Sequence, residues 1–274
     1  LFFPPYSNSL YGFGGLFFWC EENVKNTTNE SSTVLGLPLY RLGMNTALQT
    51  CTKILSSDRG GYACFVNVHS LTESRDNPKT RIALEESTYA FPDGVPLVWV
   101  SSLKGEKIVE RVCGPDFMSA LLSAHPGEHF GFIGGKVGQA ERIAERFGIR
   151  SISYSPPHRP FGEESALEDW EGFKKTCLRA GQDTPKCVWV CLGAPKQELW
   201  MQTVSAISPK TFFFGVGAAI DFLAGEKRRA PRWMQTLGLE WFFRLIQEPR
   251  RLGPRYFSTN SRFILAVLVD LFRR

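Results

Sequence analysis

A strand followed by a helix is encoded by the stretch Lys186-Cys-Val-Trp-Val-Cys-Leu192 and by Gly193-Ala-Pro-Lys-Gln-Glu198 after it. The first stretch is a near-continuous apolar run of strand length, which is typical of a parallel strand buried on both faces. The second opens with a glycine-containing turn and places Glu198 in a first helical turn, where the helix dipole favours an acidic side chain. Together they predict one strand-helix unit of a parallel sheet.

Strand-like and helix-like segments alternate in the same way along most of the chain. Further strands are expected at 34–39, 62–68, 89–92, 129–133, 149–154 and 211–216. Helices are expected from Asn45 or Thr46 to about Ser56, and at 72–86, 139–147 and 164–180. Strands that alternate with helices predict an α/β fold in which a mainly parallel sheet has helices on both faces.

The chain is predicted to have three parts. Residues 1–33 are an N-terminal extension or linker, whose apolar start is broken by proline and glycine and makes a poor signal peptide because it lacks a basic beginning. Residues 34–225 form the α/β core. Residues 226–274 form a basic, aromatic appendage with helices expected at Trp233–Gln247 and Phe263–Phe272. No apolar run reaches the roughly 20 residues that a membrane-spanning helix needs.

Positive charge is concentrated in the appendage. The whole chain has a formal net charge of +5, yet residues 227–274 alone contain 11 Lys/Arg and 3 Asp/Glu. Charge by itself is compatible with nucleotide phosphates, a lipid diphosphate, anionic headgroups or nucleic acid. No nucleic-acid-binding motif occurs, so nucleic acid is not expected as a partner. Arginines interleaved with aromatic residues favour a membrane surface, although a solvated basic face over a packed aromatic core gives the same pattern.

The seven cysteines show no spacing typical of a metal site. Several lie in apolar runs, so we interpret them as reduced, buried thiols of a cytosolic protein. No bound metal is expected.

Polar or glycine-rich turns follow five of the expected strands. They are Asn67-Val-His69, Asp93-Gly94, Gly134-Gly135, Gly193–Glu198 and Gly215–Asp221. Because ligands of parallel α/β folds bind at the carboxyl ends of the strands, these turns predict the position of an active site.

Each of these turns also has a purely structural interpretation. Asp93 can act as a general base or can hydrogen-bond its own backbone as a turn residue. The glycines at Gly134 and Gly135 can admit a diphosphate to a helix N-terminus or can form a plain tight turn. Gln197 and Glu198 can bind sugar or uracil edges or can serve the first turn of a helix, and His69 can be an acid/base group or a polar strand-end residue.

Six motifs occur in one order along the chain and together resemble a known family. They are Phe91-Pro-Asp-Gly-Val-Pro, Glu110-Arg-Val-Cys-Gly-Pro-Asp-Phe, Phe132-Ile-Gly-Gly, Leu192-Gly-Ala-Pro-Lys-Gln-Glu, Gly215-Val-Gly-Ala-Ala-Ile-Asp-Phe-Leu-Ala-Gly, and Arg228-Arg-Ala-Pro with Gly238-Leu-Glu-Trp, Arg244 and Glu248-Pro-Arg-Arg. This pattern closely resembles the WecG/TagA/CpsF family of bacterial glycosyltransferases over about residues 34–257.

The resemblance implies a Rossmann-like core and an inverting, metal-independent transfer that needs no cofactor. The donor would be a UDP-sugar, and the acceptor a polyprenyl-diphosphate-linked sugar at the cytoplasmic face of the cell membrane, in polysaccharide or teichoic-acid-type synthesis. Asp93 matches the family's proposed base, Gln197 a pocket residue, and Arg244, Arg250 and Arg251 an arginine motif thought to hold diphosphate. The other expected substrate-binding residues are Asn67, His69, Gly94, Arg111, Gly134, Gly135, Glu198, Gly217 and Asp221.

One departure from the family pattern concerns the donor sugar. Relatives in teichoic-acid synthesis carry a threonine two residues before the asparagine that matches Asn67, whereas Phe65 stands there in this chain. The run Phe65-Val-Asn-Val-His69 is more similar to the exopolysaccharide branch, so glucose-type donors stay open beside N-acetylmannosamine. A homo-oligomer is also compatible with the sequence.

Two rival functions fit the sequence less well. A nucleotide-dependent oxidoreductase or epimerase would need a full glycine fingerprint and a following acidic residue, which the Gly134 segment lacks. A non-catalytic membrane-binding module would leave the turns at Asp93 and Gln197 unexplained.

Overall fold

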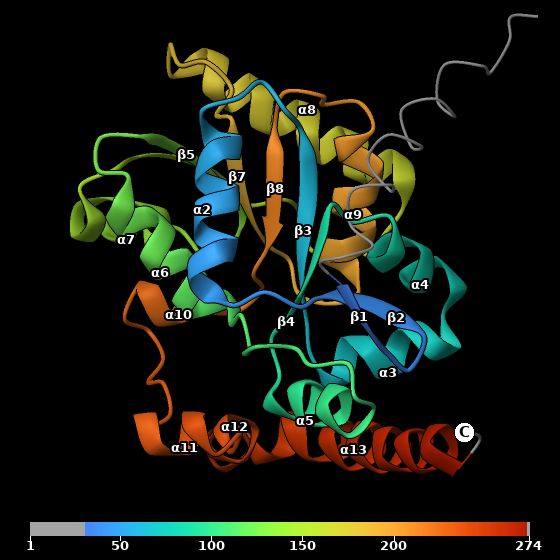
Figure 1. The fold of residues 1–274 in the computed structure, drawn as a ribbon. Coiled ribbons are helices and arrows are strands. Elements are labelled where there is room, and N and C mark those ends of the chain that lie inside the picture. The colour runs from blue at the N-terminus through green and yellow to red at the C-terminus, as the bar shows by residue number, and fades with distance from the viewer. Residues whose placement is uncertain (1–30, 273–274) are drawn as a thin grey trace, which may run out of the picture.

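The computed structural model describes residues 31–272 and is built around one six-stranded parallel sheet (Figure 1). The strand order is β4-β3-β8-β7-β5-β6, and every neighbouring pair is parallel. The strands are β3 (Gly61–Val66), β4 (Tyr89–Pro92), β5 (His129–Gly134), β6 (Arg150–Tyr154), β7 (Cys187–Cys191) and β8 (Phe212–Gly215). The predicted α/β fold with a mainly parallel sheet is therefore confirmed.

Strand β8 shows why these apolar runs form a sheet covered on both sides. Side chains alternate between the two faces of a strand, and Phe213 packs in one core cluster while Phe212 and Phe214 pack in the other. Phe213 meets the rings of Trp170 and Trp200, with centroids 5.3 and 5.6 Å apart. Burying a side chain of this size contributes about 1.5–3 kcal/mol, so both faces need helices to cover them.

Two groups of helices supply that cover. One core cluster contains residues of α3 (Val68–Asp76), α4 (Pro78–Glu85), α5 (Val95–Leu103), α8 (Glu163–Arg179) and α9 (Lys196–Ser205). The other contains residues of α2 (Met44–Leu55), α6 (Gly114–Ala124), α7 (Gln139–Phe147) and α10 (Ala219–Leu223). The helices expected at 139–147 and 164–180 correspond to α7 and α8, whereas α5, α6 and α10 were not predicted.

Local turn chemistry corrects three of the expected elements. The expected strand 34–39 is a hairpin of β1 (Ser31–Val34) and β2 (Leu37–Tyr40), because Leu35 and Gly36 both take positive φ angles and form a two-residue turn. The expected helix 72–86 is two helices, separated where Asn77 caps α4 and Pro78 occupies its first turn. Helix α2 starts after Gly43, without the side-chain cap expected at residue 45 or 46.

The appendage is three helices that lie along the end of the molecule where the strands point (Figure 1). They are α11 (Arg232–Thr236), α12 (Glu240–Gln247) and α13 (Pro249–Phe272). The single helix expected at 233–247 is wrong, because Gly238 takes a φ of +70° and separates α11 from α12. The short helix expected at 263–272 is the end of the 24-residue α13, which contains Pro254 in its interior.

Ion pairs fix α13 to the core. Lys104 Nζ, at the end of α5, lies 2.8 Å from Asp270 Oδ2, and Arg262 pairs with Asp76 of α3. Between residues 31 and 272, no helix combines the length and apolar character needed to cross a bilayer. The predicted extension 1–33 lies outside the described residues except for 31–33, which belong to β1. The three predicted domain boundaries stay predictions.

Candidate active site

A cavity of about 780 Å³ opens at the carboxyl ends of five neighbouring strands, β4, β3, β8, β7 and β5. The core forms one wall, and α5, α12 and α13 form the others. The cavity brings together most of the predicted site residues: Asn67, His69, Asp93, Gly94, Arg111, Gly135, Gln197, Glu198, Gly217, Asp221 and Arg244. Gly134 and Arg250 are not among its lining residues, and the side chain of Arg251 lies outside the described part of the chain.

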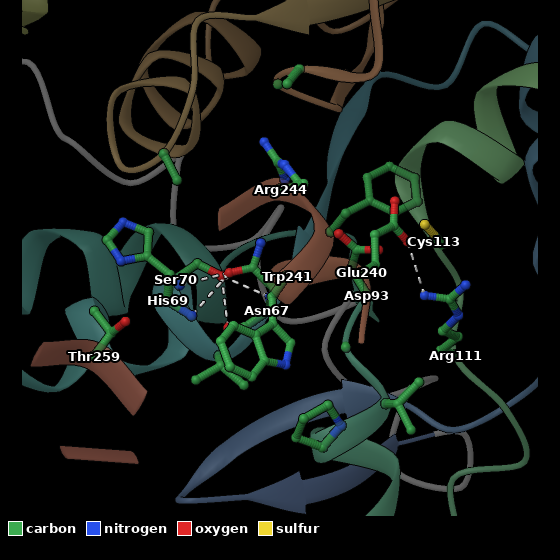
Figure 2. A pocket seen from close by; sticks show the side chains of 18 of the residues that line it. Asn67, His69, Ser70, Asp93, Arg111, Cys113, Glu240, Trp241, Arg244 and Thr259 are labelled. Atoms are coloured by element: carbon green, nitrogen blue, oxygen red, sulfur yellow. Dashed lines mark hydrogen bonds and ion pairs between the residues drawn. The ribbon is translucent and has the colours of Figure 1, made fainter. Parts of the chain in front are cut away.

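The position of Asp93 is fixed by the end of strand β4. Its backbone N–H donates to the carbonyl of Val66 at the end of β3, 2.8 Å away, and the following residue, Gly94, is the N-cap of α5. The side chain is half-buried and lines the cavity. Figure 2 shows its carboxyl group beside Cys113 and Glu240. Asp93 thus projects from a rigid strand end toward the space where a ligand can bind.

The surroundings of Asp93 raise its pKa from the ordinary 3.8 to about 7. Burial is the largest cause, and the negative charge of Glu240 adds to it. A hydrogen bond with the Cys113 side chain, the charge of Arg111 and the backbone N–H of Gly114 act in the opposite direction. A carboxylate with a pKa near neutrality is matched to general-base catalysis, because it both loses and accepts a proton readily at that pH.

A network of charged side chains joins Asp93's neighbours to the appendage. Arg229 donates to Cys113 Sγ at 3.2 Å, to Asp116 Oδ2 at 3.0 Å and to Glu240 Oε1 at 3.2 Å. Arg111 Nη1 lies 3.5 Å from the other oxygen of Glu240, as the dashed line in Figure 2 marks. Glu240 begins α12, so Arg111 of the core and Arg229 at the start of the appendage hold this helix at the site.

Sequence reasoning missed the roles of Cys113 and Glu240. Both residues lie in motifs that carry the family resemblance, and those motifs were the sequence feature that could have pointed to them. Their contact through Arg229 joins segments more than 100 residues apart, and no local pattern predicts such a pairing.

Gln197 presents a buried acceptor to the cavity. Its Nε2 donates to the carbonyl of Gly215 and to Glu198 Oε1, each at 3.1 Å. Its Oε1 is buried and accepts no hydrogen bond from the described residues. The Gly217 backbone lies nearby, and a Cβ added there would be 3.5 Å from that oxygen. An unmatched buried acceptor costs about 1–3 kcal/mol, so a ligand N–H or O–H that reaches it gains affinity.

Asp221, on α10, lines the cavity as an ionised carboxylate. Gln139 Nε2 and Lys227 Nζ each lie 3.0 Å from its carboxylate oxygens. Burial raises its pKa, but the hydrogen bonds and the positive charge outweigh that effect, and the pKa falls below its usual value. Asp221 therefore offers charged acceptors to hydroxyl groups at neutral pH.

Asn67 and His69 line the cavity from the start of α3. Asn67 Oδ1 accepts the backbone N–H groups of His69 and Ser70, and the Ser70 hydroxyl accepts the N–H of Asn67. This reciprocal cap fixes the helix start. Asn67 therefore has a structural role, and only its remaining amide group is available to a ligand.

Gly134, the last residue of β5, and Gly135 after it serve packing. A Cβ on Gly134 would lie 3.0 Å from the carbonyl oxygen of Cys191, and one on Gly135 would lie 2.7 Å from Ile220 Cδ1. The backbone N–H of Lys136 donates to Gln139 Oε1 at 2.8 Å, so this donor is already used within the protein. The tight-turn interpretation explains both glycines, and a phosphate-binding role for them stays a prediction.

The arginines predicted to bind diphosphate do not all lie at the cavity. Arg244 of α12 lines the cavity, with its guanidinium over the Phe222 ring at 5.8 Å. It forms no ion pair with any side chain that the structure describes. Arg250 is exposed at the start of α13. Of the two arginines with described side chains, Arg244 is therefore the one that can reach a ligand.

A family comparison agrees with this geometry. The model of the WecG/TagA/CpsF glycosyl transferase family matches residues 32–274, which includes the sheet, the cavity and the appendage. The chain belongs to this family. The resemblance inferred from the six motifs is confirmed, and the exopolysaccharide branch stays a prediction.

Membership of the WecG/TagA/CpsF family makes the chain a glycosyltransferase of cell-surface polysaccharide synthesis. A reaction of that kind needs a nucleotide-sugar donor and an acceptor. The residues 31–272 contain no group of three or more His, Cys, Asp or Glu side chains that could hold a metal ion.

Proposed function

We propose that this chain is an inverting glycosyltransferase that moves a hexose or N-acetylhexosamine from a UDP-sugar to a polyprenyl-diphosphate-linked acceptor. The single observation behind the mechanism is the Asp93 carboxyl group, which lines the cavity with a pKa of about 7. No metal or cofactor takes part in the proposal.

In the proposed reaction, Asp93 removes the proton of the acceptor hydroxyl. The hydroxyl oxygen forms a bond to the anomeric carbon from the face opposite the nucleotide, and the bond between that carbon and the β-phosphate oxygen breaks. UDP leaves with the electron pair, while the proton stays on Asp93. One displacement of this kind inverts the anomeric centre.

The departing diphosphate carries negative charge that must be stabilised in the transition state. Arg244 is available for this because its guanidinium, which lines the cavity, has no ion-pair partner among the described side chains. Lys227 also lines the cavity, although Asp221 and Glu248 share its charge at 3.0 and 3.1 Å. Gln197 Oε1 and the Asp221 carboxylate would orient donor N–H and hydroxyl groups.

The shape of the cavity supports a lipid-linked acceptor. One end of the cavity is lined by apolar side chains of α5 and α13, including Trp99, Leu103, Ile264 and Leu268. Each of these four side chains is more than 40% exposed. Burying them against a hydrocarbon chain would gain about 25 cal/mol per Å² of apolar surface. A polyprenyl chain suits this end, while its diphosphate lies toward Arg244.

The same helices provide the proposed contact with the inner face of the cell membrane. Apolar side chains are exposed along the appendage at Trp233, Leu237, Phe242, Ile246 and Phe257. The basic side chains Arg228, Arg232 and Arg250 come from the same region. Apolar and basic groups on one set of helices favour an anionic lipid surface.

The test is transfer from a panel of UDP-sugars to a polyprenyl-diphosphate sugar, with wild type compared with Asp93→Asn. The variant should lose transfer by about 10²–10⁴-fold, the usual contribution of a general base, while it still binds UDP. The matched control is Asp58→Asn, because Asp58 is exposed and pairs with Lys186. Native transfer by Asp93→Asn would show that Asp93 is not the base. No transfer by wild type to any lipid-diphosphate acceptor would contradict the proposed acceptor.

A further inference from the structure

The indole ring of Trp241 forms part of the cavity wall that the appendage supplies. Trp241 lies on α12, lines the cavity and is 38% exposed. The rings of Phe242 and Tyr256 each have their centroid 5.8 Å from that of Trp241, at interplanar angles of 72° and 81°. T-shaped contacts of this kind are stabilising. The indole is therefore held in place by its neighbours and still presents surface to a ligand (Figure 2).

The position of Trp241 along α12 relates it to the proposed reaction. Arg244 follows Glu240 by four residues and Trp241 by three, so the three side chains share one face of the helix, and all of them line the cavity. Glu240 lies beside the Asp93 carboxyl group (Figure 2), and four residues of helix place Arg244 about 6 Å further along. A single pyranose ring spans a comparable distance. A sugar with one hydroxyl at Asp93 and its diphosphate toward Arg244 would therefore cover Trp241.

Helix α13 adds hydrogen-bonding groups to the same part of the wall. Tyr256, which contacts Trp241, and Asn260 lie one helical turn apart, and both line the cavity. Asn260 is half-buried, and its side chain forms no hydrogen bond with the residues that the structure describes between 31 and 272. A side-chain amide has two N–H groups to donate and a carbonyl oxygen to accept. The amide of Asn260 is thus available to a ligand beside an aromatic surface.

An aromatic surface beside an available amide fits a sugar better than it fits the other parts of a lipid-linked substrate. C–H groups point from the faces of a pyranose ring and carry slight positive charge, so they pack against the negative face of an aromatic ring. The hydroxyls on the rim of the sugar hydrogen-bond with an amide. A hydrocarbon chain would leave the Asn260 amide without a partner, and a phosphate would gain little from the Trp241 indole.

We propose that Trp241 and Asn260 form the subsite for the acceptor's sugar, with the indole against a face of the pyranose ring and the amide bonded to its hydroxyls. Both residues come from appendage helices, which also supply the apolar end of the cavity. Gln197 and Asp221, proposed for the donor, come from the core. The subsite therefore belongs to the acceptor. The inference rests on the proposed function, because it requires a lipid-linked sugar in this cavity.

Binding measured by calorimetry tests the subsite without the need for catalysis. The probes are farnesyl-diphosphate-linked glucose and N-acetylglucosamine, compared with farnesyl diphosphate, which lacks the sugar. Trp241→Leu should weaken binding of the sugar-bearing probes about tenfold, and Asn260→Ala should weaken it about fivefold. Neither variant should change the affinity for farnesyl diphosphate or for UDP. Trp241→Phe keeps an aromatic face and should retain most of the wild-type affinity.

Two matched controls remove similar groups outside the cavity. Phe147→Leu replaces a half-buried aromatic ring of α7, and Ser261→Ala removes an exposed hydroxyl next to Asn260 on α13. Neither residue lines the cavity, so neither variant should change the affinity for any probe. In a transfer assay, Trp241→Leu should raise the KM for the sugar-bearing acceptor and leave the KM for the UDP-sugar unchanged.

The outcomes separate the subsite from the proposed function. If Trp241→Leu binds the sugar-bearing probes as wild type does, or loses affinity equally for farnesyl diphosphate, the inference is overturned while the proposed function stands. A raised KM for the UDP-sugar in place of the acceptor would have the same meaning. If Trp241→Leu does not fold, Asn260→Ala decides, because alanine favours a helix, and a wild-type affinity would overturn the subsite. A wild type that neither binds the probes nor transfers to them would contradict the proposed function, and the inference with it.

Discussion

Asp93 should lower the stability of the folded protein at the pH where it works. Its pKa is about 7 in the folded state and 3.8 as an ordinary carboxyl group. A carboxyl group whose pKa is raised by folding binds more protons in the folded state, so stability falls as the pH rises from about 4 to about 7 and is then constant. Asp93→Asn removes this titration and should therefore stabilise the protein at alkaline pH.

The magnitude follows from the difference between the two pKa values. At 1.36 kcal/mol per unit, the cost is about 2 kcal/mol at pH 5 and about 4 kcal/mol at pH 8. These are upper limits, because Asp93 is only half-buried and solvent screens part of the effect.

Urea unfolding at pH 5 and pH 8 measures the effect. The advantage of Asp93→Asn over wild type should grow by up to about 2 kcal/mol between the two pH values. Asp58→Asn is the control, since the Asp58 carboxylate is exposed. An Asp93→Asn advantage that is the same at both pH values, or that shrinks toward pH 8, would refute the raised pKa.

Three further predictions concern packing, charge and the membrane. Gly135→Ala should lower the unfolding free energy by about 1–3 kcal/mol more than Gly181→Ala does. Both glycines have positive φ, but only the new Cβ at residue 135 would contact Ile220 and Gln139. Equal losses in the two variants would contradict the packing role. Arg244→Ala should lower transfer at least tenfold more than Arg250→Ala, because Arg244 lines the cavity and Arg250 does not; the reverse order in kcat/KM would exclude Arg244 as the main phosphate ligand. Ile246→Glu should weaken co-sedimentation with anionic vesicles, while Leu178→Glu, at an exposed apolar site on α8, should not. Equal binding by both variants would place the lipid contact elsewhere.

The parts of the fold that could be predicted are those in which an apolar run in the sequence marks a buried segment. The apolar runs of β3, β7 and β8 are buried on both faces, so hydrophobicity alone marks them. Helices α5 and α6 were not predicted, and each has a proline as its second residue, Pro96 in α5 and Pro115 in α6. The length of α13 was underestimated because Gly253 and Pro254 predicted an interruption that the helix tolerates.

The candidate site was predictable where its residues follow strands. Asp93 and Gln197 occur at strand-end turns, and the sheet order brings those turns to one cavity. The contacts of Arg229 with Cys113, Asp116 and Glu240 depend on how the appendage lies on the core, and no sequence period encodes them. The repulsion and hydrogen bonding that adjust Asp93 could thus be found only in three dimensions.

The pH dependence of kcat/KM for glycosyl transfer tests the central claim most directly. If Asp93 is the general base, kcat/KM of the wild type should rise about tenfold per pH unit below pH 7 and level off above it, at the pKa that the site gives Asp93. The residual activity of Asp93→Asn should lack this limb. A wild-type profile that is flat from pH 5 to pH 9, or an acid limb that persists in Asp93→Asn, would contradict the account.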